Sequence, residues 1–320
     1  MEIAVRKRSV SQSARPPAGA SAGSSWRKSA PPLDLPLIAG LDLFTGPLWR
    51  DLGGMGTDYV HGYTPAETRR LSDQAGTLAD LLHGGTTYAP GSRVLEAGCG
   101  VGAQTVQLVT RSPGIDLVSI DISEASLAQA KSRVAENAPD ATVDWRHADL
   151  HDLAGEKFDH VFVCFVLEHL PDPVAALVGL RGLLNPGGTV TVIEGDHESA
   201  FFHPRSAQAQ AVIDCLVDLQ AAAGGDSLIG RRLQPLLEEA GYDDVQVGPR
   251  TVYADQNLPH LVDGFTRKTF IAMVESVRDR AIAAGLRTES EWAAGIRDLE
   301  KSAGPGGTFH YTFFKGVGRT

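Results

Sequence analysis

The chain has 320 residues, of which 42% are hydrophobic and 21% are charged. This ordinary globular composition suits one large α/β domain with elaborations, or two modest domains. No stretch approaches the roughly 20 consecutive apolar residues that cross a bilayer, so no membrane span is expected. The three scattered cysteines, Cys99, Cys164 and Cys215, form neither a disulfide framework nor a CxxC metal site. Their pattern favours a reducing, cytoplasmic location.

Charge is unevenly distributed along the chain. Six of the 29 basic residues but only one of the 39 acidic residues fall within residues 1–32, so residues 33–320 carry a net charge of −15. A body this acidic repels a phosphate backbone, and no basic stripe interleaved with aromatic residues offsets the repulsion. Nucleic acid is therefore not expected as a partner, and a small molecule is favoured.

The N-terminal segment is rich in Ser, Ala, Pro, Gly and Arg and has almost no large apolar side chains. Such a segment buries too little surface to offset its ordering entropy, so we expect residues 1–35 to be a disordered tail. Its Arg-rich, acid-poor character also resembles an organelle transit peptide, and that alternative stays open.

Removing residues 1–32 is expected to leave the melting temperature nearly unchanged, because a disordered tail contributes nothing to a core. Thermal unfolding of the full-length and shortened proteins checks this. A fall of several degrees in the shortened protein would show that the tail packs against the fold.

Residues 36–90 are expected to form an N-terminal helical cap. A helix is predicted over 64–83, with Thr64 as N-cap, Pro65 as first helical residue and Glu67 closing a capping box. Apolar residues then recur at helical spacing and define one buried face, namely Leu71, Ala75, Leu78 and Leu82.

From residue 93 the pattern becomes one of alternating strands and helices. Strands are predicted at Arg93–Ala97, Leu117–Ile120, Thr142–Arg146, His160–Phe165 and Thr189–Glu194. Helices are predicted at Ala103–Thr110, Glu124–Asn137 and Leu177–Leu184. This alternation favours an α/β fold with a mostly parallel sheet and helices on both faces. The later chain adds strands at 244–253 and Thr308–Val317, and helices near 206–223, 230–240, 260–285 and 289–302. We expect these helices to cover the site.

A glycine motif follows the first strand. Glu96, Gly98, Gly100 and Gly102 form the pattern E-x-G-x-G-x-G. Glycines there let the backbone turn sharply and let a ligand lie against it. Asp121 ends the next strand, 19 residues beyond Gly102. A carboxylate at that position accepts hydrogen bonds from the two ribose hydroxyls of an adenosine.

Three details distinguish this motif from that of a nicotinamide enzyme. The third glycine falls one residue earlier than in the G-x-G-x-x-G motif. Asp149, after the third strand, is suited to accept from an adenine amino group. Glu96 at the strand end suits a cationic amino-acid group better than a pyrophosphate. S-adenosylmethionine is the adenosine that bears an amino acid in place of a pyrophosphate, so it is the expected cofactor.

These residues resemble the class I S-adenosylmethionine-dependent methyltransferases over about residues 91–200, and among them the quinone-biosynthesis and small-molecule type. The resemblance implies a Rossmann-like, seven-stranded sheet whose last strand is antiparallel, with residues 201–320 completing it. It also implies the positions that line the cofactor, which are the glycines with Glu96, Asp121 and Ile122, Asp149 and Leu150, and the segment Phe165–Leu170. Asn185–Gly188 matches the turn before the fifth strand.

Candidate catalytic residues follow the fourth and fifth strands, because ligands of such sheets bind beyond the carboxyl ends of the strands. They are Glu168, His169, Glu194 and His197. A base matters only if the acceptor must lose a proton, since alignment carries most of a methyl transfer. Each of the four also has a plain structural interpretation. A metal site built from Glu194, Asp196, His197 and His203 matches no known spacing and is not expected.

Two further residues are candidates for cofactor contact. Tyr59 precedes the first helix and is expected either to close over the cofactor or to pack against the core. Gln74, on the polar face of that helix, is expected to reach the carboxylate of the methionine part. The predicted reaction is methyl transfer to O, N or C of a small, partly apolar molecule. The alternatives are a nicotinamide oxidoreductase and a cofactor-binding protein that does not methylate, such as a regulator or a cyclase-like scaffold.

Overall fold

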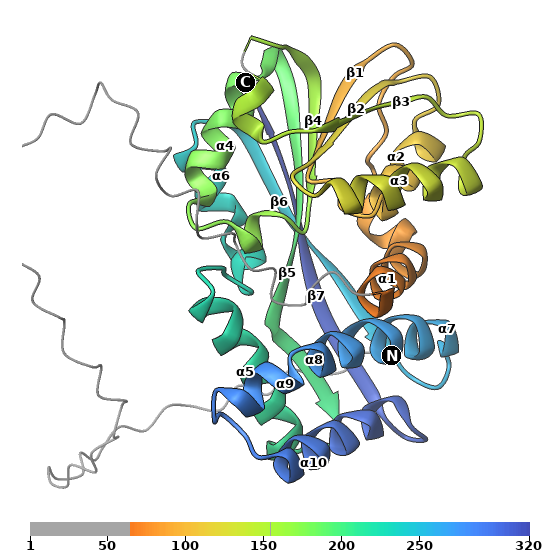
Figure 1. The fold of residues 1–320 in the computed structure, drawn as a ribbon, viewed down its shortest axis with the longest axis vertical. Coiled ribbons are helices and arrows are strands. Elements are labelled where there is room, and N and C mark those ends of the chain that lie inside the picture. Colours follow the sequence, from red (N-terminus) through yellow and green to blue (C-terminus); the bar gives the residue numbers. More distant parts are fainter. Residues whose placement is uncertain (1–64, 154) are drawn as a thin grey trace, which may run out of the picture. The chain divides into compact units, whose positions relative to one another are not determined.

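The computed structural model describes residues 65–153 and 155–320. The predicted tail, Tyr59 and the proposed N-cap Thr64 lie outside the described residues. Figure 1 shows the sheet with its helices. Its seven strands have the order β3-β2-β1-β4-β5-β7-β6. They are β1 (Arg93–Ala97), β2 (Asp116–Asp121), β3 (Val143–His147), β4 (Phe158–Cys164), β5 (Leu184–His203), β6 (Asp243–Ala254) and β7 (Thr308–Arg319).

Strands β1 to β5 pair in parallel, whereas β7 runs antiparallel to both β5 and β6. The predicted Rossmann-like sheet with an antiparallel last strand is therefore confirmed. The helices are α1 (Pro65–His83), α2 (Ala103–Arg111), α3 (Glu124–Asn137), α4 (Pro173–Gly182), α5 (Ala207–Ala222), α6 (Leu233–Glu239), α7 (Pro259–Leu261), α8 (Ala272–Ser276), α9 (Arg278–Ala283) and α10 (Glu289–Glu300). A π-helix, η4 (Val262–Ile271), links α7 to α8.

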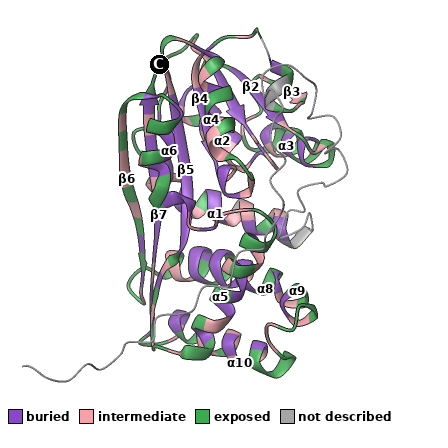
Figure 2. Ribbon diagram, turned by 90° about the vertical axis from the view of Figure 1, so that its left-hand side faces the viewer, coloured by how far each residue is buried: buried purple, intermediate pink, exposed green. Residues whose placement is uncertain are grey.

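The central strands β1, β2 and β4 are mostly buried, as their apolar composition predicts. Consecutive residues of β1 belong to different cores. Val94 packs in a core shared with α1, α2, α5, η4 and α10, and Leu95 packs in a core shared with α4 and α6. Figure 2 shows the buried strands between helices whose outer faces are exposed. None of the helices within 65–153 and 155–320 is long and apolar enough to cross a membrane.

Strand β5 is longer than predicted and continues nine residues beyond Glu194. Gly195 and the polar residues after it are typical of a loop in isolation. Here their backbone is held by antiparallel pairing with β7, with one register shift between Asp196 and Phe201. The Asn185–Gly188 segment, predicted as a turn, forms the irregular start of this strand.

Two helix boundaries also differ from prediction. Helix α4 begins at Pro173, because Asp172 is its N-cap and accepts a hydrogen bond from the Ala175 amide at 2.8 Å. The predicted start at Leu177 overlooked this pair of helix-start signals. The single helix predicted over 260–285 is divided into α7, η4, α8 and α9. At Gly264 of η4, a Cβ atom would lie 2.2 Å from Thr77 of α1, so packing against α1 constrains this segment.

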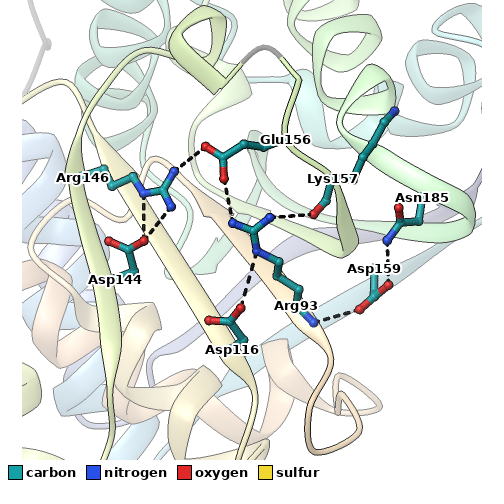
Figure 3. Close-up of polar contacts among 8 residues, drawn as sticks. All are labelled: Arg93, Asp116, Asp144, Arg146, Glu156, Lys157, Asp159 and Asn185. Carbon is teal, nitrogen blue, oxygen red and sulfur yellow. Dashed lines mark hydrogen bonds and ion pairs between the residues drawn. The ribbon is translucent and has the colours of Figure 1, made fainter.

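A network of ion pairs joins β1, β3 and the segment before β4 (Figure 3). Glu156 accepts hydrogen bonds from Arg93 at 2.7 Å and from Arg146 at 2.5 Å. Arg146 also pairs with Asp144 at 2.6 Å. These groups are partly exposed, and exposed pairs typically contribute about 0–1 kcal/mol each. None of them lines the cavity described below, so the network has a stabilising role.

Candidate active site

A cavity of about 310 Å³ lies at the carboxyl ends of β1, β2 and β4. Residues of α1, α2, α3, the segment after β3, β5, the end of α5, η4, α8 and β7 also line it. This is where open α/β sheets bind ligands, because the loops after parallel strands converge there. The sequence-predicted location of the site is therefore the location of the cavity.

The glycine loop forms one end of the cavity. Gly98 and Gly100 have φ angles of 76° and 51°, in the left-handed region that favours glycine. A Cβ atom at Gly98 would lie 2.6 Å from a methyl group of Val166, whereas at Gly100 it would meet nothing within 4 Å. The loop thus packs on the segment after β4 and presents open backbone to the cavity at Gly100.

Asp121 at the end of β2 faces the same space. Its carboxylate accepts hydrogen bonds from the amides of Gly100 at 2.7 Å and Ser123 at 2.8 Å. Burial raises the pKa of Asp121, and these two donors offset the effect only in part. The carboxylate therefore connects the glycine loop to the start of α3 and lies at the cavity wall.

The structure separates the predicted cofactor residues into two groups. Those that line the cavity are Gln74, Gly98, Gly100, Asp121, Ile122, Asp149 and Phe165. Glu96 and Gly102 are not part of its lining, and the side chain of Leu150 lies outside what the structure describes. Gly102 instead allows α2 to approach α3, since a Cβ atom there would lie 2.7 Å from Ala130.

Glu96 lies beneath the glycine loop. The sequence predicted that its carboxylate would face a cationic ligand group, and this position differs from that prediction. Its side chain is on the face of β1 covered by α2, where it accepts hydrogen bonds from Thr105 and Ser119, both at 2.7 Å. Burial raises the pKa of Glu96 to about 7 despite these donors. The alternation of side chains along a strand explains this placement.

Glu168 and His169 both line the cavity. Glu168 accepts a hydrogen bond from the Gln220 amide at 3.0 Å, and its other oxygen lies 3.6 Å from Nε2 of His169. Burial opposes ionisation of Glu168, but the nearby His169, the Gln220 donor and the charge of Arg70 outweigh it and lower its pKa. Glu168 is therefore a buried negative charge at the cavity wall.

His197 forms a buried pair with Tyr311. Its Nδ1 atom and the Tyr311 hydroxyl share a hydrogen bond of 2.7 Å. Its Nε2 atom is buried and has no hydrogen-bond partner among the described residues. Burial lowers the pKa of His197, although Glu168 acts in the opposite direction. The imidazole is thus neutral near pH 7 and lines the cavity.

Glu194 does not line the cavity, unlike the other three candidate catalytic residues. Side chains alternate along β5, so Gly195 and His197 face the cavity while Glu194 and Asp196 face away. Asp196 forms a two-pronged ion pair with Arg231, at 2.6 and 2.7 Å. Within the described ranges, no group of three or more His, Cys, Asp or Glu residues could hold a metal ion.

The cavity also contains residues that sequence reasoning did not assign to the site. They are the rings of Phe265, Phe270, Tyr311 and Phe313, which form an aromatic wall together with Phe165, a predicted cofactor residue. Nothing local in the sequence shows which aromatic rings border a cavity.

A buried polar group from α1 borders the cavity as well. It consists of Glu67, Arg70 and Gln74, with Arg70 donating to Glu67 at 2.5 and 2.8 Å and to Gln74 at 3.1 Å. Only a capping-box role was predicted for Glu67. The spacing of three and four residues along one helix face is a signal that could have identified the group.

Comparison with known proteins agrees with this geometry. The sequence profile of the methyltransferase domain family matches residues 95–190. A ubiquinone biosynthesis O-methyltransferase of Acinetobacter baylyi is 31% identical over 134 residues, covering 41% of this chain and 50% of the relative. Residues 95–190 therefore form a methyltransferase domain, and the comparisons support a class I S-adenosylmethionine-dependent methyltransferase. The cofactor of this family is the one that the glycine motif and Asp121 predicted.

Two more comparisons extend beyond the matched domain. An uncharacterised 37.1 kDa protein from a Streptomyces fradiae transposon is 30% identical over 219 residues, covering 67% of this chain and 59% of that protein. A structure of Haemonchus contortus phosphoethanolamine N-methyltransferase 2 has a TM-score of 0.52 at 14% identity, covering 83% of this chain and 60% of that chain. That likeness concerns the fold alone. The chain spans 24–59% of the length of the first three curated relatives that it matches.

Proposed function

We propose that this methyltransferase moves a methyl group from S-adenosylmethionine to O, N or C of a small, partly apolar molecule. The observation that carries the proposal is the continuity of one cavity. It includes the glycine loop and Asp121 together with the His197–Tyr311 pair and the aromatic wall. A donor site and an apolar acceptor site in one cavity are what a direct transfer between two small molecules requires.

The residues around the glycine loop fit the cofactor. The backbone at Gly100 opens onto unfilled space, so a ligand can lie against it. Asp121 offers carboxylate oxygens to ribose hydroxyls, and Ile122, 60% exposed, offers an apolar edge beside it. Asp149 is proposed to contact the adenine end and Gln74 the amino-acid end, and both residues line the cavity. The bound cofactor supplies an electrophilic methyl group on a sulfonium.

His197 is proposed as the residue that accepts a proton from the acceptor. Its Nε2 atom has the required lone pair when the proton resides on Nδ1, and no described group competes for it. Tyr311 fixes the orientation of the ring through the hydrogen bond to Nδ1. Gly195 makes room for this pair, because a Cβ atom there would lie 2.4 Å from the Tyr311 hydroxyl.

The aromatic wall is proposed to select the acceptor. Phe265, Phe270 and Phe313 are almost fully buried, so they exclude water and offer contact to an apolar molecule. Residues 65–90 and 201–320 would then serve as the cap and the acceptor-covering part around the 91–200 core. We place the protein in the cytoplasm, in keeping with three free cysteines and no predicted membrane span.

Calorimetry tests the function directly. The purified protein is expected to bind S-adenosylmethionine or S-adenosylhomocysteine at micromolar concentrations and NAD far more weakly, because Asp121 and the glycine loop suit an adenosine without a pyrophosphate. The reverse order of affinities would contradict the proposal. Steady release of S-adenosylhomocysteine with phenolic, carboxylate and amine acceptors then distinguishes a methyltransferase from a protein that only binds the cofactor.

A further inference from the structure

Glu194 is completely buried at the end of the parallel part of β5, outside the cavity. Its Oε1 atom accepts hydrogen bonds from the backbone amides of Val166 at 3.0 Å and Leu167 at 2.8 Å. These amides begin the 3₁₀-helix η2 (Leu167–His169), whose N-cap residue supplies no side-chain hydrogen bond. Glu194 therefore satisfies helix-start amides that the loop leaves unpaired.

The segment held in this way carries several cavity residues. Phe165 precedes the two amides and has a φ angle of 59°, a left-handed conformation that is unfavourable for a residue with a side chain. Its ring lies 5.5 Å from that of Phe313 in the aromatic wall. Val166 packs on Gly98 of the glycine loop, and Glu168 follows at the cavity wall.

We propose that Glu194 is a positioning residue that fixes the loop after β4 through its hydrogen-bonded Oε1 atom, and that it needs no negative charge to do so. An oxygen acceptor suffices for two amide donors, whether the group is a carboxyl, a carboxylate or a side-chain amide. The proposal rests on the methyltransferase function only for its link to cofactor binding. The contact itself is independent of the reaction.

The electrostatic surroundings support an uncharged Glu194. Burial and the nearby Glu168 raise its pKa well above the usual range, and the backbone donors offset only part of that rise. Glu168, by contrast, lies near His169, the Gln220 donor and Arg70, which lower its pKa. One of two neighbouring buried carboxyl groups thus carries the charge, and the other holds the loop.

The test compares Glu194→Gln, which keeps the oxygen without the charge, with Glu194→Leu, which removes the acceptor. Glu198→Leu is the matched control, since Glu198 is on the same strand with its side chain 53% exposed. Hydrogen exchange at the Val166 and Leu167 amides and the affinity for S-adenosylhomocysteine are measured for each. Loss of the buried acceptor in Glu194→Leu should speed exchange and weaken binding about tenfold or more.

In Glu194→Gln, both quantities are expected to stay within about threefold of wild type, because the acceptor oxygen remains. If Glu194→Gln speeds exchange and weakens binding as much as Glu194→Leu does, or fails to fold, the residue needs its charge and the proposal is wrong. Unchanged exchange in Glu194→Leu would also overturn it. Should the wild-type protein fail to bind S-adenosylhomocysteine, the proposed function fails, whereas the exchange data still decide the role of Glu194.

Discussion

Replacing His197 by alanine is expected to lower kcat about 10²–10⁴-fold when the acceptor is a phenol or an enol, the range for loss of a general base. The variant removes the Nε2 atom of His197, which is buried and without a hydrogen-bond partner among the described residues. No base is then left there to accept the proton of the methyl acceptor. Affinity for S-adenosylhomocysteine should stay intact, because the hydrogen bond of His197 is to Tyr311, whereas Asp121 is hydrogen-bonded to Gly100 of the glycine loop and to Ser123. Turnover measured by S-adenosylhomocysteine release, with affinity measured separately, checks both parts.

Companion variants locate the effect. Tyr311→Phe removes the hydroxyl that orients the imidazole and should lower kcat by less than His197→Ala. Glu168→Ala and His169→Ala test the second acid–base pair in the same cavity. If the acceptor is already an anion or a neutral amine, no single replacement should lower kcat more than about tenfold, since positioning of the two reactants accounts for most of the rate. Full activity in all of these variants on the identified acceptor would place the proton chemistry elsewhere.

The pH dependence of kcat follows from the lowered pKa of His197. The neutral imidazole is the active form, so activity should persist as the pH falls through the usual histidine range near 6.5. It should be lost only when the pH passes below the lowered pKa and the ring becomes protonated. A profile that already falls above pH 6.5 would contradict a buried, neutral His197 as the base.

Replacing Asp121 by alanine is expected to weaken cofactor binding by about 1.5–3 kcal/mol, the range for a lost hydrogen bond to a charged group with its partner left unpaired. Calorimetry with S-adenosylhomocysteine measures the change. An affinity within twofold of wild type would show that Asp121 does not bind the ribose.

The structure adds a second consequence for this variant. Because the Asp121 carboxylate accepts from Gly100 and Ser123, its loss also frees two backbone amides in the cofactor-free protein. Thermal unfolding without cofactor should therefore show some loss of stability, where sequence reasoning alone predicts almost none. Asp140→Ala, at an exposed acidic position between α3 and β3, controls for the removal of a negative charge.

The sequence predicted the sheet well because its signals are local. Arg93–Ala97 and Glu124–Asn137 have the predicted boundaries, and Ser123 caps the second of these elements, with its hydroxyl accepting from the Ser126 amide. Strand periodicity and capping depend on residues close together in the chain, so they can be read without the fold. The glycine motif and Asp121 could be identified for the same reason.

By itself the sequence determined the fold class, the family, the cofactor and the end of the sheet at which the site lies. The tertiary structure alone decided which of the candidate residues face the cavity. Glu194 and His197 were equivalent in sequence, but β7 extends β5 by antiparallel pairing and strand alternation directs them to opposite faces. The partnership of His197 with Tyr311, 114 positions away, likewise depends on long-range strand pairing that no local pattern encodes.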